Sequence, residues 1–178
     1  MTSTSEISRL VWVDPVRKAL VLPIVVGGRG AVDFARAVHL GLGGRDQEAP
    51  SSRGSNARIA LPPIRGHDMT ISIFALKTSR DDGYRRDFWR YAEHTRWVVL
   101  STVGPDYDPS WRTFVPDLGA RIRSHRRDMV MGLHGPRTLT EAVRAADLPD
   151  PLVIDPRPVS VVKAMARHFL AWSKVGSG

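Results

Sequence analysis

The chain contains no cysteine, which excludes disulfide bonds, thiolate metal sites and cysteine nucleophiles. No apolar run approaches the roughly 20 residues that a membrane-spanning helix needs, and residues 1–8 lack the charged-then-apolar order of a signal peptide. We therefore expect a cytoplasmic protein without a transmembrane segment. Acidic residues are fewer than basic ones, 18 against 26, giving a net charge of +8. Because no basic run alternates with aromatic residues as in single-strand binders, we do not expect a nucleic-acid partner.

What remains has an ordinary globular composition. A chain of 178 residues with 42% hydrophobic residues is long enough for one domain with a core. We predict an N-terminal arm, residues 1–16, that is partly disordered, followed by a single domain over residues 17–178. Inside the arm, Leu10–Val13 is a short apolar piece that either adds an edge strand or stays loose.

The stretch from Leu20 to His39 organises the rest of the chain. Leu20–Val26 is a nearly continuous β-branched apolar run, typical of a strand buried on both faces. Three glycines follow it: Gly27, Gly28 and Gly30. Apolar residues then recur at helical spacing: Ala31, Phe34, Ala35, Val38 and Leu42. Strand, glycine turn and helix form a phosphate-binding loop, because the loop amides and the helix N-terminus point at the anion.

The chemical groups of such a loop are nevertheless replaced. A Walker loop reads G-x-x-x-x-G-K-[ST]. If Gly30 is its last glycine, Ala31 stands at the lysine position and Val32 at the hydroxyl position, while the first glycine falls on Val25. Asp33 adds a negative charge where an anion should sit.

This stretch resembles the opening of a Ras-like small GTPase and, more narrowly, is similar to the GTP-binding proteins of actinobacterial conservon operons. Those proteins open with G-G-x-G-x-G-K-T-T-F, followed by a helix ending in A-V-S. Here Phe34 and Ala37–Val38 match that helix without a gap, whereas Ala31, Val32 and Asp33 replace K-T-T.

The order of the predicted elements extends the resemblance over residues 17–172. We predict strands at Lys18–Val26, Asn56–Leu61, Asp68–Leu76, Trp97–Val103, Asp128–Leu133 and Leu152–Asp155. We predict helices at Ala31–Leu42, Tyr84–His94, Trp111–Arg127, Thr138–Ala146 and Ser160–Lys174. The second and third strands should form an antiparallel hairpin. Pro23 in the first strand indicates a bulge, a strand that begins at Ile24, or a neighbouring defect. The expected fold is α/β: a Ras-like P-loop GTPase fold, with a six-stranded mostly parallel sheet and helices on both faces.

The resemblance also shows which ligands a working GTPase would need and this chain lacks. The first switch should fall in Gly43–Ser55, which contains no threonine, and Ala75–Ser79 stands in place of D-x-x-G. The guanine-reading motif, N-x-x-D in conservon proteins, is replaced by Leu133, His134, Gly135 and Pro136. Asp155-Pro156-Arg157 resembles the C-D-A-R motif that lies under the base in that family.

These replacements predict a pseudo-GTPase: catalytically inactive, unable to bind GTP, and with no cofactor, catalytic residue or metal ligand. The vestigial phosphate loop comprises Gly27, Gly28, Gly30, Ala31 and Val32. The vestigial base loop comprises Leu133, His134, Gly135, Pro136 and Asp155. Such a protein would be an interaction or regulatory subunit in conservon-type signalling. The partners implied by the resemblance are a Roadblock-type regulator, an intact small GTPase or a histidine-kinase-like protein of the same operon, through which it would reach the membrane.

Two other classes stay open. A nucleotide- or anion-binding protein or enzyme could use a rebuilt, non-standard P-loop, and the net charge would suit a nucleic-acid-binding module. For a protein partner, arginine and aromatic residues are the types that most often anchor interfaces. They gather at Tyr84, Arg85, Arg86, Trp89 and Arg90, although the same residues would also suit a solvated helix.

Overall fold

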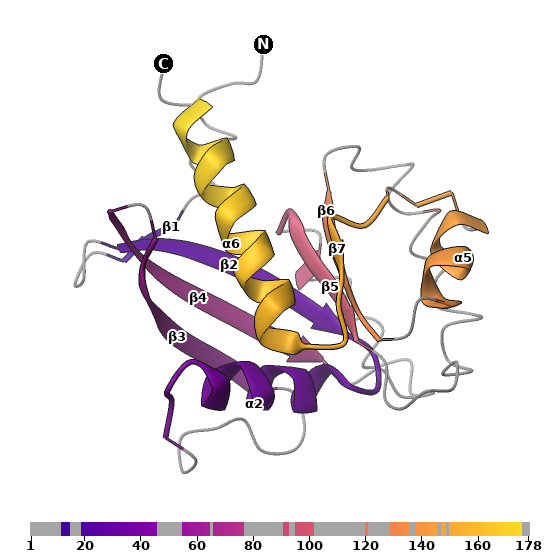
Figure 1. The fold of residues 1–178 in the computed structure, drawn as a ribbon, viewed down its shortest axis with the longest axis horizontal. Coiled ribbons are helices and arrows are strands. Elements are labelled where there is room, and N and C mark those ends of the chain that lie inside the picture. Colours follow the sequence, from indigo (N-terminus) through magenta and orange to yellow (C-terminus); the bar gives the residue numbers. More distant parts are fainter. Residues whose placement is uncertain are drawn as a thin grey trace.

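The computed structural model describes residues 12–14, 19–45, 55–64, 66–76, 91–92, 95–101, 120, 129–135, 138–145, 147–148 and 150–175. Within them the chain forms an α/β fold, one mixed sheet with helices packed on it (Figure 1). The strands are β1 (Trp12–Asp14), β2 (Ala19–Gly27), β3 (Ser55–Ile64), β4 (His67–Leu76), β5 (Trp97–Ser101), β6 (Val130–His134) and β7 (Val153–Ile154). The helices are α2 (Ala31–Gly41), α5 (Thr138–Ala145) and α6 (Pro158–Val175).

The main path of the sheet has the strand order β3-β4-β2-β5-β6-β7. With β2 counted as the first strand, this order is 2-3-1-4-5-6. The pair β3–β4 is antiparallel, which confirms the predicted hairpin, and the other neighbours on the path are parallel. The strand β1 lies off this path and pairs antiparallel with the start of β2, residues 19–21. The end of the predicted N-terminal arm therefore belongs to the sheet as an added strand.

Both faces of the sheet are covered, as the apolar pattern predicts. Ile24 and Val26 of β2 belong to a core beneath α2 and α6, whereas Val25 belongs to a second core that includes Val143 of α5. Successive side chains of a strand point to opposite faces, so a run without polar residues is needed where both faces are buried. On α6, the buried residues recur at helical spacing: Val162, Met165, Ala166 and Phe169.

Pro23 lies in β2 without breaking it. The register with β4 continues from Leu20 through Gly27 without a shift, so the strand neither bulges at Pro23 nor begins at Ile24. On the opposite side of β2, β1 pairs with residues 19–21 and β5 with residues 25–27, which leaves Pro23 between them. The Pro23 carbonyl accepts a hydrogen bond from Thr95 Oγ1 at 3.1 Å. Thr95 Oγ1 in turn accepts a hydrogen bond from the Trp97 amide at 3.3 Å. Proline therefore occupies the position where no ladder donor is required.

An aromatic cluster joins the start of β5 to α6. Trp97 is completely buried, and its ring centroid lies 5.5 Å from that of Phe169 and 6.4 Å from that of Trp172. The Arg96 guanidinium lies 4.8 Å from the centroid of the Trp172 ring. These contacts fix the C-terminal half of α6 against the edge of the sheet opposite to the glycine loop (Figure 1).

Two predicted helices fall largely outside the described residues. Of Tyr84–His94 and Trp111–Arg127, the structure describes residues 91–92 and 120, which are helical. Within the described ranges, no helix combines the length and the apolar character needed to cross a membrane.

Candidate functional site

The glycine loop after β2 and the residues that follow β6 and β7 meet at one edge of the sheet, where β2, β5, β6 and β7 end. Residues 28–30 follow β2 and lead into α2, while residues 155–157 connect β7 to α6. In α/β sheets this carboxyl edge is where ligands bind, because loops and helix N-termini converge there.

The glycine loop is short, and amides at its end donate hydrogen bonds to carbonyls of the same chain. Only Gly28, Arg29 and Gly30 separate β2 from α2, and Gly28 has φ 115°, a conformation that favours glycine. The Gly30 amide donates to the Ser101 carbonyl at 3.4 Å, and the Ala31 amide donates to the Gly28 carbonyl at 3.2 Å. Both amides at the entrance to the helix are therefore engaged inside the protein.

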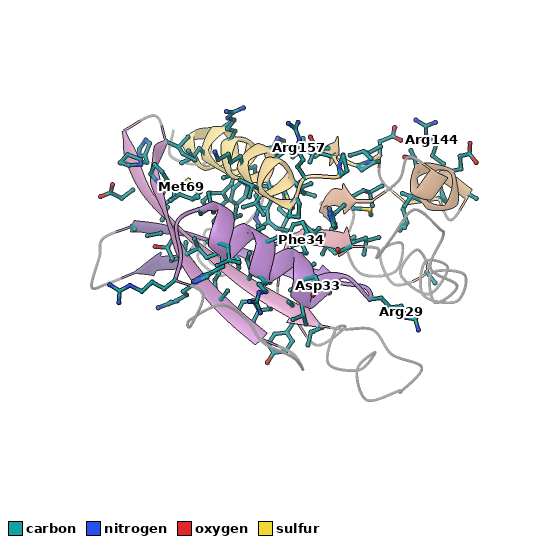
Figure 2. The ribbon with its side chains drawn as sticks, turned by 60° about the horizontal axis from the view of Figure 1, so that its bottom comes forward. Arg29, Asp33, Phe34, Met69, Arg144 and Arg157 are labelled. Carbon is teal, nitrogen blue, oxygen red and sulfur yellow. The ribbon has the colours of Figure 1, made fainter. Side chains whose placement is uncertain are left out.

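The helix that follows turns an aromatic ring inward at this edge. Phe34 is completely buried on α2, and its ring centroid lies 5.3 Å from that of His134 in an edge-on arrangement. Arg29 and Asp33 are exposed, and Figure 2 shows Arg29 extending outward from the loop. Val32 is half-buried. The charged groups of this segment thus face solvent, and the inner side is apolar.

His134, the last residue of β6, links three segments. Its Nε2 lies 3.1 Å from the Pro156 carbonyl oxygen, and its Nδ1 lies 2.7 Å from Ser101 Oγ. A carbonyl can only accept, so Nε2 carries the proton and Nδ1 accepts from the serine hydroxyl. Burial lowers the pKa of His134, against smaller raising effects of the Pro156 carbonyl and the Asp155 carboxylate. Burial therefore disfavours the protonated form of this imidazole.

Ser101, His134 and the Pro156 carbonyl are arranged like the groups of a nucleophilic enzyme. The hydroxyl stands in the place of the nucleophile, the imidazole in that of the base, and the carbonyl in that of the acceptor that orients the base. A nucleophile must be reachable by its substrate, however, and Ser101 is 0% exposed. Its backbone carbonyl also receives the Gly30 amide. In this conformation the arrangement ties the glycine loop, β5, β6 and residue 156 together instead of presenting a hydroxyl to a substrate.

Asp155 is engaged by its own loop. Its Oδ1 accepts from the Arg157 amide at 2.7 Å and from Arg157 Nε at 3.0 Å, and its Oδ2 accepts from Arg157 Nη2 at 3.0 Å. These bonds lower the pKa of Asp155 and raise the pKa of Arg157. The Asp155 amide donates to the Leu133 carbonyl at 3.2 Å, which fixes the loop beside β6.

The structure brings together most of the residues predicted from the two vestigial motifs. At the carboxyl edge lie Gly27, Gly28, Gly30, Ala31, Leu133, His134, Gly135 and Asp155. Pro136 lies outside the described residues, as do the predicted partner-surface residues Tyr84, Arg85, Arg86, Trp89 and Arg90. Val25, which the ungapped alignment places at the first Walker glycine, is inside β2 and pairs with Phe74 and Val98.

Sequence reasoning missed Ser101 and gave His134 no role beyond that of a loop residue. The available signal was a hydroxyl at the end of the apolar run Trp97–Leu100, since polar residues at the carboxyl ends of buried strands often face a site.

Among the residues that the structure describes, no three histidine, aspartate or glutamate side chains gather closely enough to hold one metal ion. No protein-family model and no curated protein sequence matches the chain.

Proposed function

We propose that this chain is a pseudo-GTPase: a Ras-like protein that does not bind GTP and acts as an interaction or regulatory subunit in a conservon-type signalling system. The strand order supports the Ras-like assignment. A 2-3-1-4-5-6 sheet with one antiparallel pair at its start is what the resemblance implies, and helices α2 and α6 lie together on one face. Fold alone does not define function, so the proposal depends on the loop at the carboxyl edge.

The observation that carries the proposal is the engagement of the loop amides. A Walker loop places four residues between its glycines and turns its amides toward phosphate. Here the position of the first glycine is taken up by strand β2, and the Gly30 and Ala31 amides are bonded to Ser101 and Gly28. A phosphate would have to break these bonds without a lysine at position 31, and it would meet the Asp33 carboxylate in the first helical turn.

The contacts of His134 support the same proposal from another side. A nucleotide stabilises a folded GTPase by mass action, so a relative without one needs other contacts at this edge. The ring contact with Phe34 and the bonds to Ser101 and Pro156 join α2, β5, β6 and the loop after β7. They connect the segments that a nucleotide would otherwise bridge.

Nucleotide titration tests the first half of the proposal. We expect no saturable binding of GTP, GDP or ATP with magnesium at up to about 100 μM by calorimetry, a range that detects binding free energies more favourable than roughly −5.5 kcal/mol. Protein purified from cells should release no nucleotide on denaturation. The variant Ala31→Lys with Val32→Thr should still not hydrolyse GTP, because the base-reading and magnesium-facing aspartates remain absent.

The same titration separates the open alternative. If phosphate or a nucleotide binds, and binding is lost in Arg29→Ala but kept in Arg144→Ala, the loop is a rebuilt anion site and the pseudo-GTPase proposal is wrong. Arg144 is a suitable control because it is exposed on α5, away from the glycine loop (Figure 2).

Co-purification tests the second half. A Roadblock-type protein, an intact GTPase and a histidine-kinase-like protein are the candidate partners. We expect Arg86→Glu with Trp89→Ala to weaken capture of such a partner while the melting temperature changes little, because both residues suit an exposed anchor. Unchanged capture would place the docking surface elsewhere.

A further inference from the structure

Arg96, which directly precedes β5, carries a guanidinium that lies between two tryptophans. The guanidinium carbon is 4.8 Å from the centroid of the Trp172 ring and 5.9 Å from that of the Trp97 ring. Among the residues that the structure describes, no ion pair includes Arg96. A guanidinium holds its N–H donors in a fixed fork that matches the two oxygens of a carboxylate. The inference drawn from this group does not depend on the proposed function.

Two N–H groups of this cluster have no hydrogen-bond acceptor within the part of the chain that the structure describes. They are Arg96 Nε and Trp97 Nε1, and both atoms are buried. Buried donors in folded proteins are nearly always bonded, so two of them in one cluster need an explanation. Arg96 and Trp172 are half-buried, so the cluster reaches the surface. An acceptor from outside the chain can therefore approach the guanidinium.

The segments that form this cluster are basic and contain no acidic residue. Neither α6, residues 158–175, nor residues 95–101 include an aspartate or a glutamate. Arg167 and His168 are exposed on α6, and within the described ranges neither forms an ion pair. The His168 ring centroid lies 5.7 Å from that of Trp97, so these basic residues adjoin the cluster. This arrangement favours a negatively charged group as the ligand.

The ring contacts favour a protein carboxylate over a nucleic acid. Single-stranded nucleic acids are bound by stacking of their bases on open aromatic faces. Trp97 is completely buried, and Trp172 lies between the Arg96 guanidinium and the Phe169 ring, whose centroid is 6.2 Å away. Neither indole is therefore an open platform for a base. The edge of the guanidinium is left, and its geometry suits a carboxylate.

We propose that Arg96, held against Trp172, anchors a segment of a partner protein that presents an aspartate or glutamate side chain. The carboxylate accepts hydrogen bonds from the guanidinium. The indole ring restrains the guanidinium before binding, so less side-chain entropy is lost when the pair forms. Arginine and tryptophan are among the residue types that dominate binding energy at interfaces. Arg167 and His168 attract further acidic residues of the same segment.

Binding of a fluorescently labelled acidic peptide to the full chain tests this proposal. The probe is a peptide of alternating glycine and glutamate, about ten residues long, and its control carries glutamine in place of glutamate. By fluorescence anisotropy, we expect saturable binding of the glutamate peptide and none of the glutamine peptide. Arg96→Lys keeps the charge but loses the fork of donors, and it should raise the dissociation constant by at least about tenfold. The matched variant Arg144→Lys, on exposed α5, should change it by less than about twofold.

Nuclear magnetic resonance of the wild type gives a measurement that does not rely on the folding of a variant. Titration with the glutamate peptide should shift the Nε–H signal of Arg96, because a carboxylate bonds to its guanidinium. The indole N–H signals of Trp97 and Trp172 should move with it, since both rings lie beside that group. The Nε–H signal of Arg144 should stay in place.

Three results would overturn the proposal. The first is no binding of the glutamate peptide at up to about 1 mM. The second is equal affinity of the wild type and a folded Arg96→Lys variant, which would show attraction by net charge alone. The third is binding that leaves the Arg96 Nε–H signal unmoved. Oligothymidine that binds more tightly than the peptide, and loses its binding in Arg96→Lys, would make this a nucleic-acid site and also overturn the proposal.

Discussion

Replacing His134 with alanine tests whether this residue holds the carboxyl edge together. The change leaves the hydroxyl of Ser101 buried and without its partner, which costs about 1–3 kcal/mol. It also removes the bond to the Pro156 carbonyl, about 0.5–1.5 kcal/mol, and the ring contact with Phe34, about 0.5–1.5 kcal/mol. We expect the free energy of unfolding to fall by about 2–6 kcal/mol.

Urea unfolding followed by circular dichroism measures this loss, and a melting curve should show a decrease of roughly 4–24 °C for a chain of this size. Glu141→Ala is a matched control, because Glu141 is exposed on α5 and should change stability by less than about 0.5 kcal/mol.

The double variant makes the test specific. Adding Ser101→Ala to His134→Ala removes the unsatisfied hydroxyl, so the double variant should be at least as stable as His134→Ala alone. The coupling free energy between the two positions should be about 1–2 kcal/mol. A coupling near zero, or a loss below about 0.5 kcal/mol for His134→Ala, would refute the role that we give this residue.

Two further predictions follow from the buried polar contacts. Burial lowers the pKa of His134 in the folded protein, so below about pH 6.5 the unfolded chain binds more protons at this site. The stabilisation from neutral His134 is therefore complete above that pH and is lost as the pH falls through the folded pKa. Urea midpoints of wild type and His134→Ala should converge on acidification, and a constant difference would contradict this. Thr95→Val leaves the Pro23 carbonyl without its donor, and we expect a loss of about 1–3 kcal/mol in urea unfolding, whereas Thr95→Ser should retain most of the stability.

The elements with strong periodicity could be predicted from sequence. The buried strand β2 and helix α2 begin and end within one residue of the prediction, and α6 within two residues. Each has an apolar pattern that only one kind of element satisfies. The hairpin β3–β4 follows from alternation, although β3 continues through Pro62 and Pro63, which alternation alone does not predict.

The interactions at the carboxyl edge could not be predicted in the same way. Ser101, His134 and Pro156 are far apart in sequence, and no local pattern encodes that they meet. The position of Pro23 could not be predicted for a similar reason. On one side of β2, β1 pairs with residues 19–21 and β5 with residues 25–27, so that Pro23 lies in the gap where no neighbouring strand needs its amide. The residues of the glycine loop and those after β6 and β7 do lie along one edge of the sheet, but the bonds among them depend on how four strands end together.

The aromatic cluster between β5 and α6 makes the folded state optically distinct. Trp97 and Trp172 are two of the five tryptophans, and their rings lie 6.4 Å apart at an interplanar angle of 78°. Indole transitions at such a separation couple, which produces a paired signal in the far-ultraviolet circular dichroism spectrum. One ring belongs to the sheet and the other to the last helix, so the signal reports the docking of α6 without any added label.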